Sequence, residues 1–229
     1  MAVAYQVAID GPAASGKSTV ARLLARRLGA HYVNTGDMYR AVTWVALEHG
    51  LEPATQASDA VRLLPQLRLE HRLTASGELG LVLNGSEVPQ ECIRAPAVAR
   101  AVSHIAAVPA VREWLVARQR EAARLGVVVM EGRDIGTVVF PQARFKFYVT
   151  ATAEVRAARR LGQAGETVPG STVASVAAEI ASRDRIDSTR AVAPLRPAPD
   201  AVVIDTSHMT LEQVTDCMVR EIRKVEPAS

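Results

Sequence analysis

A phosphate-binding loop is predicted near the start of the chain, which reads Gly11-Pro12-Ala13-Ala14-Ser15-Gly16-Lys17-Ser18 and then Thr19. These residues fit the pattern G-x-x-x-x-G-K-[ST], in which glycines let backbone N–H groups turn toward a polyphosphate. Lys17 is placed to reach the β- and γ-phosphates, and the Ser18 hydroxyl is a ligand for Mg²⁺. The alternative is a glycine-rich turn that binds nothing. The apolar run before the loop and the helical pattern after it favour a nucleoside triphosphate site.

A second polar group, containing Thr35, Tyr39 and Arg40, follows the next apolar run and opens a helical pattern. In a doubly wound sheet, the loops at the carboxyl ends of strands face the ligand crevice. These three side chains could therefore bind an anionic second substrate beside the phosphate-binding loop. An N-capped helix with a surface arginine explains them equally well, so this segment alone leaves the choice open.

A third group begins with Glu131, which ends the apolar run 127–130. An acidic residue at this point resembles a Walker B carboxylate, which orders Mg²⁺ directly or through a water molecule. Arg133 and Asp134 come next and offer a phosphate donor and a base acceptor. The alternative is a turn with a local ion pair.

Arginines dominate the last two groups. Arg183, Asp187 and Arg190 are spaced i, i+4, i+7 and share one face of an expected helix, while Arg159 and Arg160 precede a glycine-rich segment. A solvated salt-bridge face explains either group. Fixed guanidinium groups would also screen the repulsion between two polyanionic substrates. A phosphate nucleophile is already ionised, so it needs no general base.

These residues must be positioned by alternating strands and helices. Apolar runs predict parallel strands at 3–9, 31–34, 127–130, 144–149 and 201–204. Helical patterns lie at 16–28, 37–49, 109–125, 152–162, 172–188 and 211–224. This order predicts an α/β fold with a doubly wound, five-stranded parallel sheet and helices on both faces.

Two segments interrupt that pattern. Apolar residues alternate at period two from Leu67 to Leu83, and Asn84-Gly85 follows, so we expect a small antiparallel β insertion. The glycine-rich stretch 161–170 between two helices is expected to be a mobile lid.

Composition excludes several classes of partner. The net charge is +3, from 27 basic and 24 acidic residues, which is too balanced for a nucleic-acid-binding protein. No apolar run is long enough to span a membrane, and the first strand starts too early for a signal peptide. Cys92 and Cys217 are isolated and are expected to be reduced thiols. We therefore expect a cytoplasmic monomer.

The segments together resemble the bacterial cytidylate kinases, a family of nucleoside monophosphate kinases. The resemblance runs over nearly the whole chain and rests on four segments. They are residues 9–19, Thr35-Gly36 with Met38-Tyr39-Arg40, residues 132–141 (which begin Gly132-Arg133-Asp134-Ile135-Gly136-Thr137 and end at Pro141), and Arg190-Ala191-Val192-Ala193-Pro194-Leu195. The last two segments are far more specific than the phosphate-binding loop.

The resemblance implies transfer of the ATP γ-phosphoryl group to CMP or dCMP, with Mg²⁺. It implies that the acceptor phosphate is held by Thr35, Tyr39, Arg40 and Arg133, and that the cytosine edge is read by Ser103, Arg112 and Asp134. The sugar and phosphates would be bound by Arg183, Asp187 and Arg190. From the lid, ATP would be contacted by Arg159 and Arg160. Lys17, Arg133, Arg183 and Arg190 would be catalytic.

The resemblance also implies a single domain over 1–229. Its parts would be a core (1–65, 109–155 and 190–229), a CMP-binding insertion (66–108) and a lid region (156–189).

Three residues depart from the common family pattern, namely Asn34, Asp37 and Glu131. The longer arm of Glu131 is expected to alter Mg²⁺ handling slightly. A kinase for another small acceptor such as UMP stays open. A nucleotide-driven switch is the other alternative, although its D-x-x-G and N-K-x-D motifs are missing from the sequence.

Overall fold

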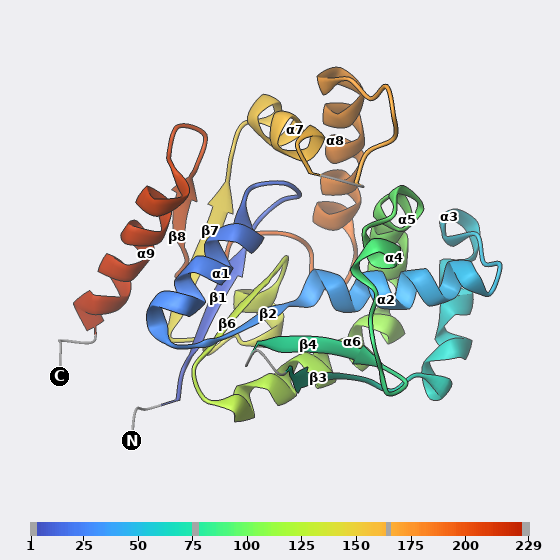
Figure 1. Cartoon of the computed structure of the whole chain (residues 1–229), viewed down its shortest axis with the longest axis horizontal. Helices are drawn as coiled ribbons and strands as arrows, with labels where there is room; N and C mark the ends of the chain where they lie inside the picture. Colours follow the sequence, from blue (N-terminus) through green and yellow to red (C-terminus); the bar gives the residue numbers. More distant parts are fainter. Residues whose placement is uncertain (1–3, 75–77, 164–165, 226–229) are drawn as a thin grey trace.

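A five-stranded parallel sheet lies at the centre of the molecule (Figure 1). The computed structural model describes residues 4–74, 78–163 and 166–225. The strands run in the order β2-β6-β1-β7-β8, with β1 at Gln6–Asp10, β2 at His31–Asn34, β6 at Val128–Gly132, β7 at Phe145–Thr150 and β8 at Val202–Asp205. The predicted fold class is confirmed. The bounds of β2 match the prediction, and those of the other four strands differ from it by one to three residues. Residue 3, where the first strand was predicted to begin, lies outside the described residues.

Helices cover both faces of this sheet, and the side chains of β1 explain why. Val7 and Ile9 pack against α1 (Lys17–Leu28) and α9 (Leu211–Val225), while Ala8 packs into a separate cluster on the other face. All three are fully buried. A strand buried on both faces is typical of a parallel sheet between helical layers.

The period-two segment forms a second, antiparallel sheet, as predicted. Its strands are β3 (Leu69–Leu73), β4 (Leu79–Leu83) and β5 (Ser86–Glu87). Asn84 and Gly85 join β4 to β5 with φ angles of 51° and 90°, the left-handed values that a two-residue hairpin turn requires. The Ser76-Gly77 turn expected between β3 and β4 lies outside the described residues.

The prediction missed the helices that flank this insertion. They are α3 (Pro53–Gln56), the 3-10 helix η1 (Ala57–Gln66), α4 (Gln90–Arg94) and α5 (Pro96–Ala107). Helix α5 packs against α2 (Thr35–Glu48), and both supply residues to one large apolar cluster. Helix α6 (Pro109–Glu121) follows and passes into the 3-10 helix η2 (Ala122–Leu125), which completes the stretch predicted as one helix.

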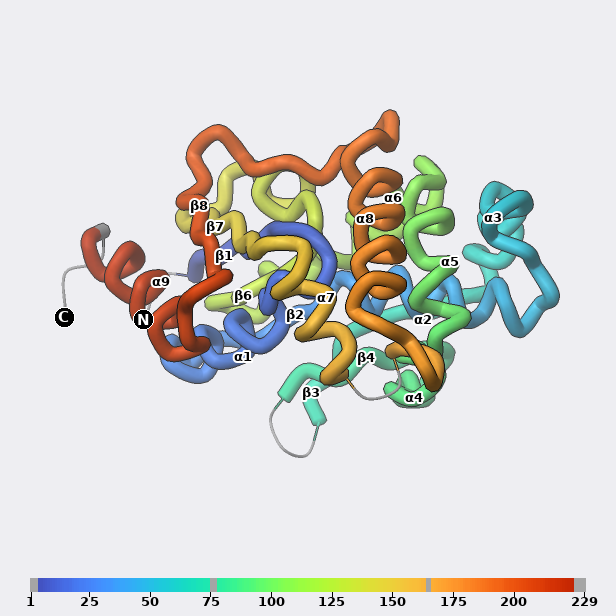
Figure 2. Tube along the Cα trace, turned by 90° about the horizontal axis from the view of Figure 1, so that it is seen from above, coloured from blue at the N-terminus to red at the C-terminus, as the bar shows by residue number. Residues whose placement is uncertain are grey.

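The predicted lid region is a pair of helices, α7 (Ala153–Leu161) and α8 (Val173–Thr189), that lie beside each other, and α8 also packs against α5 (Figure 2). Ala157, Val176 and Ile180 pack there on Ala13 of the phosphate-binding loop. The predicted i, i+4, i+7 spacing would require Arg190 to lie on the same helix as Arg183 and Asp187. It does not, because α8 ends at Thr189 and the backbone of Arg190 is extended (φ −61°, ψ 143°). Among the described residues, no helix has the length and apolar character needed to cross a bilayer.

Candidate active site

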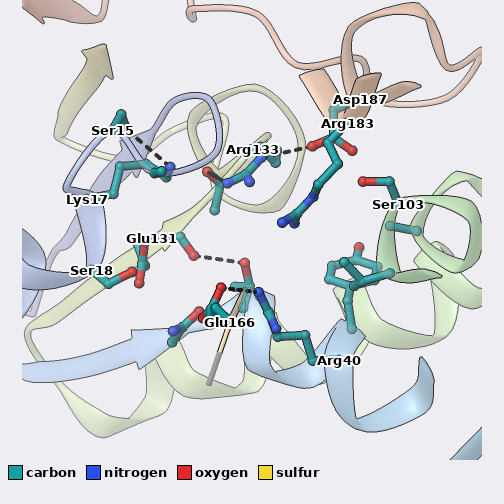
Figure 3. A pocket seen from close by; sticks show the side chains of 18 of the residues that line it. Ser15, Lys17, Ser18, Arg40, Ser103, Glu131, Arg133, Glu166, Arg183 and Asp187 are labelled. Carbon is teal, nitrogen blue, oxygen red and sulfur yellow. Dashed lines mark hydrogen bonds and ion pairs between the residues drawn. The ribbon is translucent and has the colours of Figure 1, made fainter. Parts of the chain in front are cut away.

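The phosphate-binding loop connects β1 to α1 and takes a shape that few side chains allow. Gly11 has a φ of 151°, and a Cβ atom there would lie 2.0 Å from the carbonyl oxygen of Val149. Lys17 folds back over the loop, where its Nζ donates to the Pro12 carbonyl at 2.6 Å and to Ser15 Oγ at 3.3 Å (Figure 3). Burial, with the positive charge of Arg133, lowers the pKa of Lys17 well below its usual value. An anion at this position would favour the charged ammonium.

A buried carboxylate joins this loop to the segment after β6. Asp10 ends β1, and its two oxygens accept hydrogen bonds from the backbone N–H groups of Ile135 at 2.7 Å and Gly136 at 2.8 Å. Burial raises the pKa of Asp10 to about 6, against the lowering effect of these two bonds. The segment that carries Arg133 and Asp134 is therefore fixed directly to the strand that carries the loop.

One pocket collects most of the predicted site residues. It is lined by Ala14, Ser15, Gly16, Lys17, Ser18, Thr19, Thr35, Tyr39, Arg40, Ser103, Arg112, Glu131, Arg133, Asp134, Arg160, Arg183, Asp187 and Arg190. Four others lie outside its lining, namely Gly11, Pro12, Ala13 and Arg159. Arg159 donates to the carbonyl oxygens of Ser15 at 3.2 Å and Thr206 at 2.8 Å, so it braces the outside of the loop.

At one end of the pocket, Arg112 on α6 and Asp134 form a buried ion pair. Arg112 also donates to the Ala106 carbonyl at 3.1 Å, and Arg190 lies 3.6 Å from the other oxygen of Asp134. The Arg112 guanidinium sits 5.3 Å from the centre of the Tyr39 ring, within cation–π range. Burial raises the pKa of Tyr39 to about 12, so this hydroxyl is neutral at pH 7.

The middle of the pocket is crowded with positive charge. Arg133 donates to Asp187 Oδ2 at 3.0 Å, and Arg183 projects from α8 into the same space (Figure 3). Burial, together with the charges of Arg40 and Arg133, lowers the pKa of Arg183 to about 10, and its buried Nε has no hydrogen-bond partner. Burial alone would raise the pKa of Asp187, but Arg133 and its neighbours hold it low. Such a site is prepared for polyanions.

Two pocket residues that the sequence analysis did not select lie at the lid side. Arg94 on α4 and Glu166, after α7, both line the pocket. Glu166 accepts from Arg40 at 3.2 Å, lies 3.5 Å from Arg94 and pairs with Arg160. No local motif marks either residue, because only the tertiary fold brings α2, α4 and α7 together.

The cytidylate kinase family model matches residues 7–224. The chain belongs to the cytidylate kinase family. It is 49% identical over 219 residues to a cytidylate kinase of Pelotomaculum thermopropionicum, which covers 94% of this chain and 95% of that one. It is 46% identical over 224 residues to a bifunctional pantoate ligase/cytidylate kinase of a Synechococcus species, covering 96% of this chain. The chain spans only 40% of that bifunctional relative.

A solved structure of an uncharacterized protein from Eubacterium ventriosum superposes with a TM-score of 0.50. That match covers 95% of this chain and 98% of the other at 9% identity, so it supports the fold alone.

The family's kinase chemistry raises the question of a metal site. Ser18 is exposed at the start of α1, and the buried carboxylate of Glu131 lies in the same pocket. Tyr32 donates to Glu131 Oε1 at 2.7 Å, while both oxygens of Asp10 are taken by backbone N–H groups. Within the described ranges, no three His, Cys, Asp or Glu residues cluster as metal ligands. A hydroxyl and one carboxylate fit Mg²⁺, which keeps several waters and uses substrate phosphates as ligands.

Proposed function

We propose that this chain transfers the γ-phosphoryl group of ATP to CMP or dCMP, giving CDP or dCDP and ADP. Membership of the cytidylate kinase family supports the reaction class. The observation that carries the choice of acceptor is the buried group of Ser103, Arg112 and Asp134, which shares one pocket with the phosphate-binding loop.

The donor would bind along the phosphate-binding loop, from Gly11 to Thr19. Lys17 exchanges its internal contacts for the β- and γ-phosphates, which are better partners for a buried ammonium than a carbonyl and a hydroxyl are. Arg160 acts on ATP from the lid, and Arg159 supports the loop from outside. Mg²⁺, held by Ser18 and by Glu131 directly or through water, would neutralise charge that builds up on the phosphates.

The base would be read by hydrogen bonds in the buried end of the pocket. The exocyclic amino group of cytosine is a donor, which suits the acceptors Asp134 and Ser103, while Arg112 suits the acceptors on the ring. Uracil carries a carbonyl oxygen in place of that amino group. Its oxygen would face the Asp134 carboxylate and leave buried polar groups unpaired, which discriminates strongly.

The reaction itself would depend on positioning and charge. The attacking oxygen of the acceptor phosphate is ionised at neutral pH, so no side chain needs to remove a proton. Thr35, Tyr39, Arg40 and Arg133 hold the acceptor phosphate, and Arg183, Asp187 and Arg190 orient the sugar and the phosphates. Lys17, Arg133, Arg183 and Arg190 stabilise the negative charge on the transferred group.

In this scheme residues 66–108 form the CMP-binding insertion, 156–189 form the lid and the rest forms the core. The chain would act as a cytoplasmic monomer on small molecules and would need no nucleic acid or membrane.

The deciding experiment is a coupled ADP-release assay with Mg-ATP and CMP, dCMP, UMP, AMP or GMP as acceptor. We expect strong activity with CMP and dCMP and little with the others. Equal activity with UMP would overturn the proposed base reading but keep the kinase. Activity with none of the five would overturn the proposed reaction.

A further inference from the structure

Glu166 is the centre of a buried cluster of charges on the lid side of the pocket. Arg40 from α2, Arg94 from α4 and Arg160 from α7 all approach its carboxylate. The side chains of Arg40 and Glu166 are only 6% and 7% exposed. Three elements that are distant in sequence therefore converge on one acidic side chain of the segment between α7 and α8.

The cluster holds more positive than negative charge. Asp37 pairs with Arg94, so two carboxylates face three guanidinium groups. Arg183 adds positive charge nearby, and so does Arg133, which is itself paired with Asp187. Burial and this crowding lower the pKa of Arg160 to about 9. A phosphate monoester, with up to two charges and three terminal oxygens, would satisfy such a site better than one carboxylate does.

One of these guanidinium groups, that of Arg40, is proposed to hold the acceptor phosphate. Arg40 donates one N–H to the Ile93 carbonyl at 2.8 Å, and another N–H to Glu166 at 3.2 Å. Glu166 itself lines the pocket beside Arg40 (Figure 3). A phosphate bound to Arg40 would therefore compete with the Glu166 carboxylate for the same donor, and displacement of Glu166 would also release Arg160.

We propose that Glu166 is a specificity-determining residue, an internal anion that occupies the acceptor-phosphate residue Arg40 and the donor residue Arg160 until a phosphorylated acceptor displaces it. This inference rests on the proposed kinase function. Displacement frees Arg160 to contact the phosphates of the donor. Water and unphosphorylated nucleosides bring no anion, so they leave Arg160 paired with Glu166 and the donor without that contact. Glu166 thereby makes phosphorylation of the acceptor a condition for transfer.

The test compares Glu166→Gln with Glu179→Gln, a matched change at an exposed position on α8. Binding of CMP and of cytidine is measured calorimetrically without ATP. If Arg40 is free of Glu166 in about one tenth of the wild-type molecules, Glu166→Gln should bind CMP about tenfold more tightly, because all of its molecules are then ready for the phosphate. Cytidine affinity stays unchanged in both variants, and Glu179→Gln matches the wild type throughout. ADP release without an acceptor rises several-fold in Glu166→Gln only.

A purely structural counter-ion predicts the opposite result. Loss of its charge would leave CMP affinity equal or weaker, and that outcome overturns the inference. Glu166→Asp is a second variant in case Glu166→Gln misfolds, because it keeps the negative charge on a shorter side chain. We expect it to bind CMP several-fold more tightly than the wild type does. Failure of the wild type to bind or phosphorylate CMP would instead refute the kinase function. If the wild type phosphorylates CMP and the Glu166 variants match it in CMP affinity and in ADP release without an acceptor, only the proposed role of Glu166 is refuted.

Discussion

The two ends of the pocket are built in different ways. The donor end is one continuous loop, in which Lys17 donates hydrogen bonds to two oxygens of the loop itself, those of Pro12 and Ser15. The acceptor end is assembled from α2, α4, α6, α8 and the segment after β6, and its arginines are held by carboxylates far away in sequence.

This contrast teaches which property each end depends on. The donor end depends on backbone shape, because the groups that the loop itself contributes to its polar contacts are mostly backbone N–H and carbonyl groups. The acceptor end depends on balanced side-chain charge, because a buried guanidinium that loses its partner is left uncompensated. Backbone changes should therefore damage the donor end most, and single charge deletions should change selectivity at the acceptor end.

Gly11→Ala is expected to have the largest effect, because it attacks the backbone of the donor end. The new Cβ would overlap the Val149 carbonyl, and the φ of 151° is strained for alanine. We expect a loss of about 4 kcal/mol in the free energy of unfolding, measured in urea. Gly29→Ala is the control, since its φ of 59° is strained but its Cβ meets nothing within 4 Å, and about 1 kcal/mol is expected. Equal losses would contradict the argument from close approach.

Lys17→Ala tests the one side chain on which the donor end relies. Its removal should lower kcat by about a thousandfold while the fold is retained, because a fixed cation at the phosphates is lost. Steady-state ADP release and circular dichroism measure the two effects. Lys224→Ala, at an exposed site in α9, should leave both unchanged. A Lys17→Ala enzyme with more than a tenth of wild-type kcat would refute the assignment.

Asp134→Ala should act on selectivity more than on the reaction. The variant removes the acceptor proposed for the cytosine amino group, so kcat/KM for CMP should fall about a hundredfold, with a much smaller change for UMP. Arg112 and Arg190 lose their shared carboxylate, so some stability is lost as well. Measuring both substrates on one preparation separates the two effects. Equal losses with CMP and UMP would rule out base reading by Asp134.

Tyr32→Phe should have the smallest effect. The Tyr32 hydroxyl holds one oxygen of Glu131, so its loss lets the carboxylate turn. We expect the Mg²⁺ concentration for half-maximal rate to rise up to about tenfold, with KM for CMP unchanged. Tyr5→Phe, outside the residues that line the pocket, is the control. An unchanged metal requirement would separate Tyr32 from Mg²⁺ handling.

The sequence was most informative where structure is local. The phosphate-binding loop, the parallel strands and the Asn84-Gly85 turn each carry their signal within a few neighbouring residues. The last helix is similar, because Thr210 and Gln213, three residues apart, exchange the two hydrogen bonds of a capping box. Such features need no knowledge of the rest of the chain.

The missed features depend on contacts across the chain. Helices α4 and α5 begin beside prolines and have little independent signal, yet they pack on α2 and supply Arg94 and Ser103. Glu166 is an ordinary acidic residue in a glycine-rich stretch until α7 brings it to Arg40. Asp10 is marked by its place before the loop, but its bonds to Ile135 and Gly136 span 125 and 126 residues.

Those two bonds have a consequence for how the substrates meet. Asp10 links the donor loop to the Arg133–Asp134 segment, so the sheet sets the distance between that loop and Arg133. If both substrates bind as proposed, this distance also governs the separation of their phosphates. Movement of α7 would change how tightly the donor is covered, whereas movement of α8 would also carry Arg183 and Asp187, which are proposed to orient the acceptor. A damaged lid would then slow the enzyme or let water in, whereas a damaged Asp10 would alter the spacing itself.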